Sequence, residues 1–116
     1  MVPSGAAATA APNASAKGGP GGVRVSGVCT KSATAELKLS RDDGRVEVEF
    51  EVDQNRNGIP WNVTLRRNGS IVASTIATTH APSGSFTVRR TASGARGTFA
   101  AVATRAGERC TAHAAL

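Results

Sequence analysis

From Val23 onward, apolar and polar residues alternate along the chain with a period of two. The clearest alternation sets apolar Val46, Val48, Phe50 and Val52 against acidic Glu47, Glu49, Glu51 and Asp53. A strand produces this pattern when one of its two faces is buried. Weaker runs of the same kind occur in 35–40, 61–66, 86–89 and 110–116, and no segment has convincing helical spacing. The pattern predicts an all-β chain.

Turn signals separate these runs. Asp43-Gly44 and Asn68-Gly69 are strong signals for two-residue hairpins, and 81–84, 93–97 and 106–107 mark further turns. The predicted strands are 23–30, 33–41, 45–53, 61–67, 70–79, 85–91, 98–105 and 109–116. At 116 residues the chain fits one domain, which we place at 23–116. The expected class is an antiparallel β-sandwich or barrel of about seven or eight strands.

The stretch WNVTLRRNG, residues 61–69, joins a Trp that opens a strand to an alternating run and a two-residue hairpin. This stretch resembles an immunoglobulin-like or fibronectin-like β-sandwich. The resemblance makes 45–53 strand B, 61–67 strand C, 85–91 strand E, 98–105 strand F and 109–116 strand G, with C, F and G in one sheet. The cysteines that antibody domains carry on B and F are absent here. The expected core is Trp61, Val46, Val48, Phe50, Val63 and Leu65.

Cys29 and Cys110 are the two cysteines of the chain, and they lie near the two ends of the predicted domain. Neither belongs to a zinc-type spacing. We predict one disulfide bond that joins the first strand to the last, with two buried free thiols as the alternative. The loop-entropy model gives such a bond about 4–5 kcal/mol of stabilisation.

Residues 1–22 are almost entirely Ala, Gly, Ser, Thr and Pro, which predicts a disordered tail. Within them, 6–16 (AAATAAPNASA) resembles the small residues around a signal-peptide cleavage site. We therefore expect a secreted protein, extracellular or associated with the cell envelope. Usage rich in Ala, Arg, Gly and Thr resembles secreted proteins of high-GC bacteria. No stretch approaches the length of a membrane-spanning helix.

The chain is basic, with a net charge of +6, and the excess lies in residues 54–116, which contain Glu108 as their one acid. Such asymmetry favours attraction to a polyanion, although plain solubility also explains it. The candidate ligand-binding residues are Arg66, Arg89, Arg105 and Arg109. We expect Arg66 and Arg105 to share an outer sheet face. The expected partner is an anionic cell-envelope polymer or an extracellular protein. Few aromatic residues argue against nucleic-acid binding.

Asp53, Asn55, Asn57 and Gly58 occupy the first, third, fifth and sixth places of a calcium-binding loop. The twelfth place, where such a loop needs a bidentate carboxylate, is Thr64, and Arg56 lies inside the loop. A structured connection between two strands explains the same residues, because Asn, Asp and Gly favour turns. A weak metal site at Asp53, Asn55 and Asn57 remains the alternative, and loop 54–60 also suits ligand contact.

We predict that the chain is not an enzyme and needs no cofactor. His80 and His113 have no nucleophile and orienting acid in a recognisable motif. Glu47, Glu49 and Glu51 project into water, where pairing with Lys38 and Arg66 accounts for them. The leading hypothesis is a secreted binding module that uses an Arg-bearing sheet face or loop 54–60. The alternative is a small serine-protease inhibitor that presents Arg56 in loop 54–60, or the turn 80–84.

Overall fold

The computed structural model describes residues 22–116, which form nine β-strands and, within that range, no helix. The strands are β1 (Gly22–Ser26), β2 (Val28–Cys29), β3 (Thr34–Asp42), β4 (Arg45–Asp53), β5 (Pro60–Arg67), β6 (Ser70–Thr78), β7 (Ser85–Ser93), β8 (Thr98–Arg105) and β9 (Glu108–Ala115). The tail expected at 1–22 falls outside the described residues except for Gly22, which opens β1.

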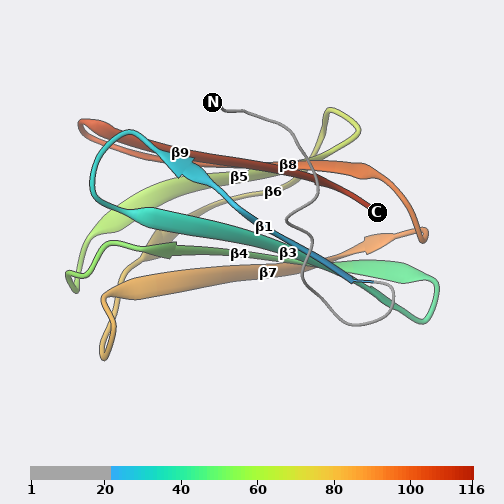
Figure 1. The fold of residues 1–116 in the computed structure, drawn as a ribbon, viewed down its shortest axis with the longest axis horizontal. Coiled ribbons are helices and arrows are strands. Elements are labelled where there is room, and N and C mark those ends of the chain that lie inside the picture. The colour runs from blue at the N-terminus through green and yellow to red at the C-terminus, as the bar shows by residue number, and fades with distance from the viewer. Residues whose placement is uncertain (1–21) are drawn as a thin grey trace.

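The strands form two antiparallel sheets that pack face to face. One has four strands in the order β1-β3-β4-β7, and the other has five in the order β2-β9-β8-β5-β6. Figure 1 shows them as stacked layers whose strands run along the long axis of the molecule, so that turns gather at both ends. The predicted sandwich class is confirmed, and the strands expected to share one sheet as C, F and G do so as β5, β8 and β9.

The first predicted strand, 23–30, is two strands in the structure. β1 pairs with β3 of the four-stranded sheet, whereas β2 pairs with β9 of the five-stranded sheet. The chain crosses between the layers at Gly27, whose N–H donates to the carbonyl of Ala35 at 2.8 Å. A Cβ on Gly27 would lie 2.7 Å from the carbonyl oxygen of Thr111. Glycine is therefore needed here because the backbones approach too closely for a side chain.

The core lies between the layers and consists of the inward-facing half of each alternating run. The residues that the alternation assigns to it are each at most 1% exposed: Val46, Val48, Phe50, Trp61, Val63 and Leu65. Within the five-stranded sheet, small side chains lie beside the large ones, since Ala101 and Ala103 of β8 pair with Leu65 and Val63 of β5. Alternating small and large side chains lets the two layers pack closely.

The predicted disulfide bond between Cys29 and Cys110 is confirmed. It joins β2 to β9, and the two residues are 81 positions apart in the sequence. The cross-link lowers the conformational entropy of the unfolded chain. For a loop of that length, the loop-entropy model gives about 4.5 kcal/mol of stabilisation for the folded state. We call the end of the sandwich with turns 54–60, 79–84 and 106–107 the disulfide end; it lies at the left of Figure 1.

Candidate functional site

The structure does not bring the four predicted ligand-binding arginines together. Arg66 and Arg109 are exposed on the outer face of the five-stranded sheet, but they lie near opposite ends of their strands. Arg89 is exposed on the outer face of the other sheet. Arg105 is not outward at all, because it follows the inward set of β8. The expectation that Arg66 and Arg105 share a face is therefore wrong.

Arg105 belongs to a polar cluster that closes the disulfide end. Its guanidinium carbon lies 5.6 Å from the centre of the Trp61 ring, within the range of a cation–π contact. Its Nη2 is 3.4 Å from Oε1 of Glu108, and its Nε donates to Oε1 of Gln54 at 3.0 Å. The charge of Arg105 is thus neutralised locally, and the side chain covers the edge of the core.

Glu108 is the centre of this cluster, and its side chain is almost fully buried. Its Oε2 accepts the backbone N–H of Ala33 at 3.0 Å, and its Oε1 accepts Nε2 of Gln54 at 3.5 Å. A buried carboxylate is stable only when it is paired and hydrogen-bonded, as this one is. Sequence reasoning missed Glu108, although its position as the lone acid in residues 54–116 was a signal.

Loop 54–60 is fixed by the buried side chain of Thr79. The Thr79 hydroxyl donates to the carbonyl of Arg56 at 2.6 Å and accepts the N–H of Ile59 at 2.9 Å. The Thr79 backbone adds two bonds, to the carbonyl of Ile59 at 2.9 Å and from the N–H of Gly58 at 2.7 Å. The loop is therefore a structured connection. The side chain of Arg56 is exposed on it, while its carbonyl is already engaged.

The residues of the predicted calcium loop bond one another in a turn. Oδ1 of Asp53 accepts the N–H of Asn55 at 2.9 Å, and Asn55 has a φ of 58°. The side chain of Asn57 is exposed. Across residues 22–116, no group of three or more His, Cys, Asp or Glu side chains is arranged to hold a metal ion. Calcium binding at this loop remains a prediction without geometric support.

The outer face of the four-stranded sheet is charged and largely ion-paired. Nε of Arg89 lies 3.2 Å from Oε2 of Glu49 and 3.8 Å from Oε2 of Glu47. The hydrogen bond and the charge of Glu49 raise the pKa of Arg89. Lys38 lies opposite Glu49 in the register, as expected, but the pairing predicted for Arg66 is wrong because Arg66 is on the other sheet. Because β7 is the neighbour of β4, Arg89 of β7 pairs with the glutamates of β4 instead.

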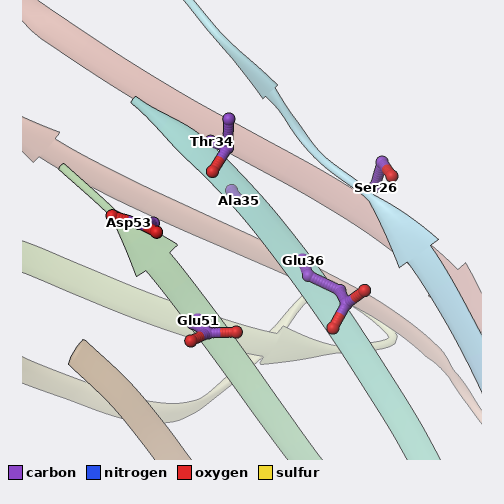
Figure 2. Close-up of a pocket in the computed structure, with 6 residues that line it drawn as sticks. All are labelled: Ser26, Thr34, Ala35, Glu36, Glu51 and Asp53. Atoms are coloured by element: carbon purple, nitrogen blue, oxygen red, sulfur yellow. The ribbon is translucent and has the colours of Figure 1, made fainter. Parts of the chain in front are cut away.

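A hollow of about 280 Å³ lies on the same face, towards the disulfide end. Figure 2 shows its lining, which consists of Ser26, Thr34, Ala35, Glu36, Glu51 and Asp53. Glu36 also pairs with Arg24 of β1 at 3.7 Å. Acidic side chains on an exposed sheet face are well solvated, and those of this hollow form no metal-holding group in the described part of the chain.

Loop 94–97 lies at the opposite end of the sandwich, at the right of Figure 1. Arginines from several strands contact this loop. Nε of Arg41 donates to the carbonyl of Ala95 at 3.0 Å. Arg67 donates through Nη2 to the carbonyl of Arg96 at 2.6 Å and through Nη1 to the carbonyl of Ser93. We define the basic end as these residues with their neighbours along the strands: Arg41, Arg45, Arg66, Arg67, Arg90 and Arg96.

The positive charge of the basic end is not neutralised by ion pairs. The acidic side chains in its turns are Asp42 and Asp43, two against six arginines. Ion pairs among the described residues involve Arg24, Arg89 and Arg105, and none involves an arginine of the basic end. All eight acids of the chain lie within the described range.

Arg67 also gives the basic end a fixed shape. Its guanidinium lies 6.0 Å from the centre of the Phe99 ring and beside Gly97, where a Cβ would come within 2.8 Å of Nε. Its acceptors are backbone carbonyls of the loop, which orient the guanidinium but leave its formal charge uncancelled. The loop and its arginines are therefore held in place by the same residue.

The two histidines lie in different parts of the fold. His80 is in the turn before β7, where its Nδ1 is 3.1 Å from the carbonyl oxygen of Ala81. His113 is exposed on the outer face of β9, opposite Ala100 of β8.

Comparison of the chain with protein-family models, with curated proteins and with solved structures finds no match. Sandwich architecture by itself assigns neither family nor function.

Proposed function

We propose that this domain is a non-enzymatic binding module for a linear anionic polymer, and that it binds through the basic end. The observation that carries the proposal is the gathering of six arginines, none of them ion-paired among the described residues, at one end of a rigid sandwich. The proposed contact is therefore at the end of the molecule and not on the sheet face that the sequence suggested.

Arginine suits this role because its guanidinium is planar, permanently charged and able to bind phosphate, sulfate or carboxylate through two hydrogen bonds. Turns at the end of a sandwich can approach an extended chain without disturbing either sheet. The loop that carries Arg96 is held by Arg67 and Arg41 before any ligand arrives. A surface that is already ordered loses less entropy on binding, which favours affinity.

We place this activity outside the cytosol. A disulfide bond in a small β domain is compatible with an extracellular location, since disulfides persist in oxidising compartments. No helix within residues 22–116 is long and apolar enough to cross a membrane. An anionic polymer of the cell envelope is the partner that such a module would meet.

The test measures retention of the protein on polyphosphate and on heparin as a function of salt concentration. Arg41→Gln with Arg96→Gln removes two charges from the basic end. Arg24→Gln with Arg89→Gln removes two charges from the ion-paired sheet face and is the matched control. We expect the wild type and the control to be retained alike, and the first variant to elute at lower salt. Each lost contact lowers the slope of log affinity against log salt by about 0.7 to 0.9.

Retention that is equal at low and high salt would contradict the proposal, because binding between exposed charges is screened by salt. Loss of retention on Arg109→Gln, and not on Arg41→Gln with Arg96→Gln, would move the contact to the face of the five-stranded sheet. Double-stranded DNA serves as a further probe of whether any polyanion suffices.

The protease-inhibitor alternative rests on the exposed Arg56 side chain in the rigid loop 54–60. A protease needs an extended segment with an accessible carbonyl, whereas the loop is a turn and the Arg56 carbonyl accepts the Thr79 hydroxyl. The geometry therefore favours this function less. Trypsin-like proteases incubated with micromolar protein should keep full activity, and inhibition abolished by Arg56→Gln would instead support the alternative.

A further inference from the structure

Each sheet of the sandwich has two edge strands, and three of the four edges are protected in ways that discourage pairing with another chain. β1 has five residues and carries Arg24, and β2 has only two residues. β7 is long but carries Arg89 and Arg90. Short length and charged side chains are the usual means by which proteins prevent edge-to-edge association.

The fourth edge, β6, has none of these protections. Its nine residues, SIVASTIAT, contain no charge, no Pro and no Gly. Five of them are β-branched, which favours the extended conformation. Ile71 and Ile76 are 60% and 68% exposed, two of the three large apolar side chains that the described surface exposes. β6 is thus a long, uncharged strand whose outer hydrogen-bonding row meets no other described strand.

We propose that β6 pairs with β6 of a second copy of this chain, antiparallel across a two-fold axis. In such an isologous contact the same row of N–H and C=O groups serves both copies, so that one interaction uses up both open edges. The two five-stranded sheets would join into one sheet of ten strands. This inference does not depend on the proposed polymer binding.

A second copy suits this edge because the seam along β6 is uncharged over most of its length. The outward neighbours of Ile76 and Ser74 on β5 are Asn62 and Thr64. The net charge of +6 opposes contact between the basic surfaces of two copies, and pairing along β6 keeps those surfaces out of the contact. Arg66 lies opposite Ile71, at one end of β6, and the antiparallel arrangement places the two copies of Arg66 at opposite ends of the seam.

The antiparallel arrangement also brings the exposed isoleucines of the two copies towards one another. Ile71 lies near the start of β6 and Ile76 near its end. Antiparallel pairing brings the start of one strand towards the end of the other, so that Ile71 of each copy approaches the Ile76 region of its partner. A seam of one strand per copy is a small interface, which implies reversible association that depends on concentration.

The test is the oligomeric state of the full chain, measured by sedimentation across about 10 µM to 1 mM, where a small interface associates. Ile76→Lys adds a charge to the seam. Val28→Lys makes the same change at the opposite edge of the same sheet, where Val28 is 72% exposed, and is the matched control. We expect dimers in the wild type and in the control, and association weakened about tenfold or more by Ile76→Lys. Circular dichroism checks that both variants keep their strand content.

Amide hydrogen exchange gives a second readout that needs no substitution. The outward amides of β6 should gain protection as the protein concentration rises, while those of β7 should not change. A wild type that stays monomeric to 1 mM would overturn the inference, as would dimers that survive Ile76→Lys or that are lost on Val28→Lys. Added salt should strengthen the dimer and weaken polymer retention, so failure of one proposal is separable from failure of the other.

Discussion

The two ends of the sandwich use the same residue type for different purposes. At the disulfide end, Arg105 contacts Trp61, Gln54 and the buried Glu108, and its charge is neutralised where it lies. At the basic end, the side-chain hydrogen bonds of Arg67 go to backbone carbonyls, so no acidic group cancels its charge. An arginine therefore stabilises the fold or offers a charge to a ligand according to what accepts its hydrogen bonds.

This contrast implies that stability is concentrated at the disulfide end and ligand contact at the basic end. The disulfide end contains the covalent bond, the buried carboxylate and the loop held by Thr79. At the basic end, the arginines other than Arg67 have exposed side chains that can be changed without opening the core. Three variants test the division, from the largest expected effect to the smallest.

Replacing Cys29 and Cys110 with Ala should have the largest effect. The loop-entropy model predicts that the free energy of unfolding falls by about 4.5 kcal/mol, which lowers Tm by on the order of 20 °C for a domain of this size. Urea unfolding and thermal melts measure both quantities. Below its Tm, the variant should retain polymer binding at the basic end. A loss under about 1 kcal/mol would contradict the importance of this cross-link.

Replacing Glu108 with Ala should come second. It leaves the buried N–H of Ala33 and the half-buried guanidinium of Arg105 without their carboxylate, which should cost about 2–3 kcal/mol. The matched control is Glu36→Ala, which breaks an exposed pair with Arg24 and should cost about 0.5 kcal/mol or less. Equal urea midpoints for the two variants would show that the polar cluster has no special role.

The smallest effect on stability should follow Arg41→Gln with Arg96→Gln at the basic end. Both side chains are exposed, so the free energy of unfolding should change by less than about 0.5 kcal/mol. The same variant should show the largest loss of polymer retention. A destabilisation as large as that of Glu108→Ala would mean that these arginines support the fold, and the two ends would not differ as described.

The strands were predictable because alternation and turn residues are local signals. In residues 46–53 the alternation determines which face is buried, because the apolar side chains are large and the polar ones are charged. β8 shows where this reasoning fails. Ala100, Ala101, Val102 and Ala103 are apolar on both faces of the strand, so the pattern leaves its orientation open, and Arg105 was assigned to the wrong face.

Features that depend on which strands become neighbours were not predictable. The partner of Glu49 is Arg89 and not Arg66 because β7, far along the chain, lies beside β4. The convergence of Arg41, Arg67 and Arg96 likewise depends on three turns meeting at one end. The sequence also does not show that β6 is an edge strand, because SIVASTIAT is compatible with a central strand as well as with an edge strand. The order of the strands in a sheet depends on how the whole chain packs, and local sequence patterns do not encode that order.

The crossing at Gly27 has a mechanical consequence. The first strand holds one layer, the chain then passes to the other layer, and the sulfur bond follows at Cys29. Tension applied at Gly22 would peel β1, reach Cys29, and pass directly through the covalent link to Cys110 and the last strand. The residues between the two cysteines, which include the basic end and β6, lie outside that path and would stay folded under load.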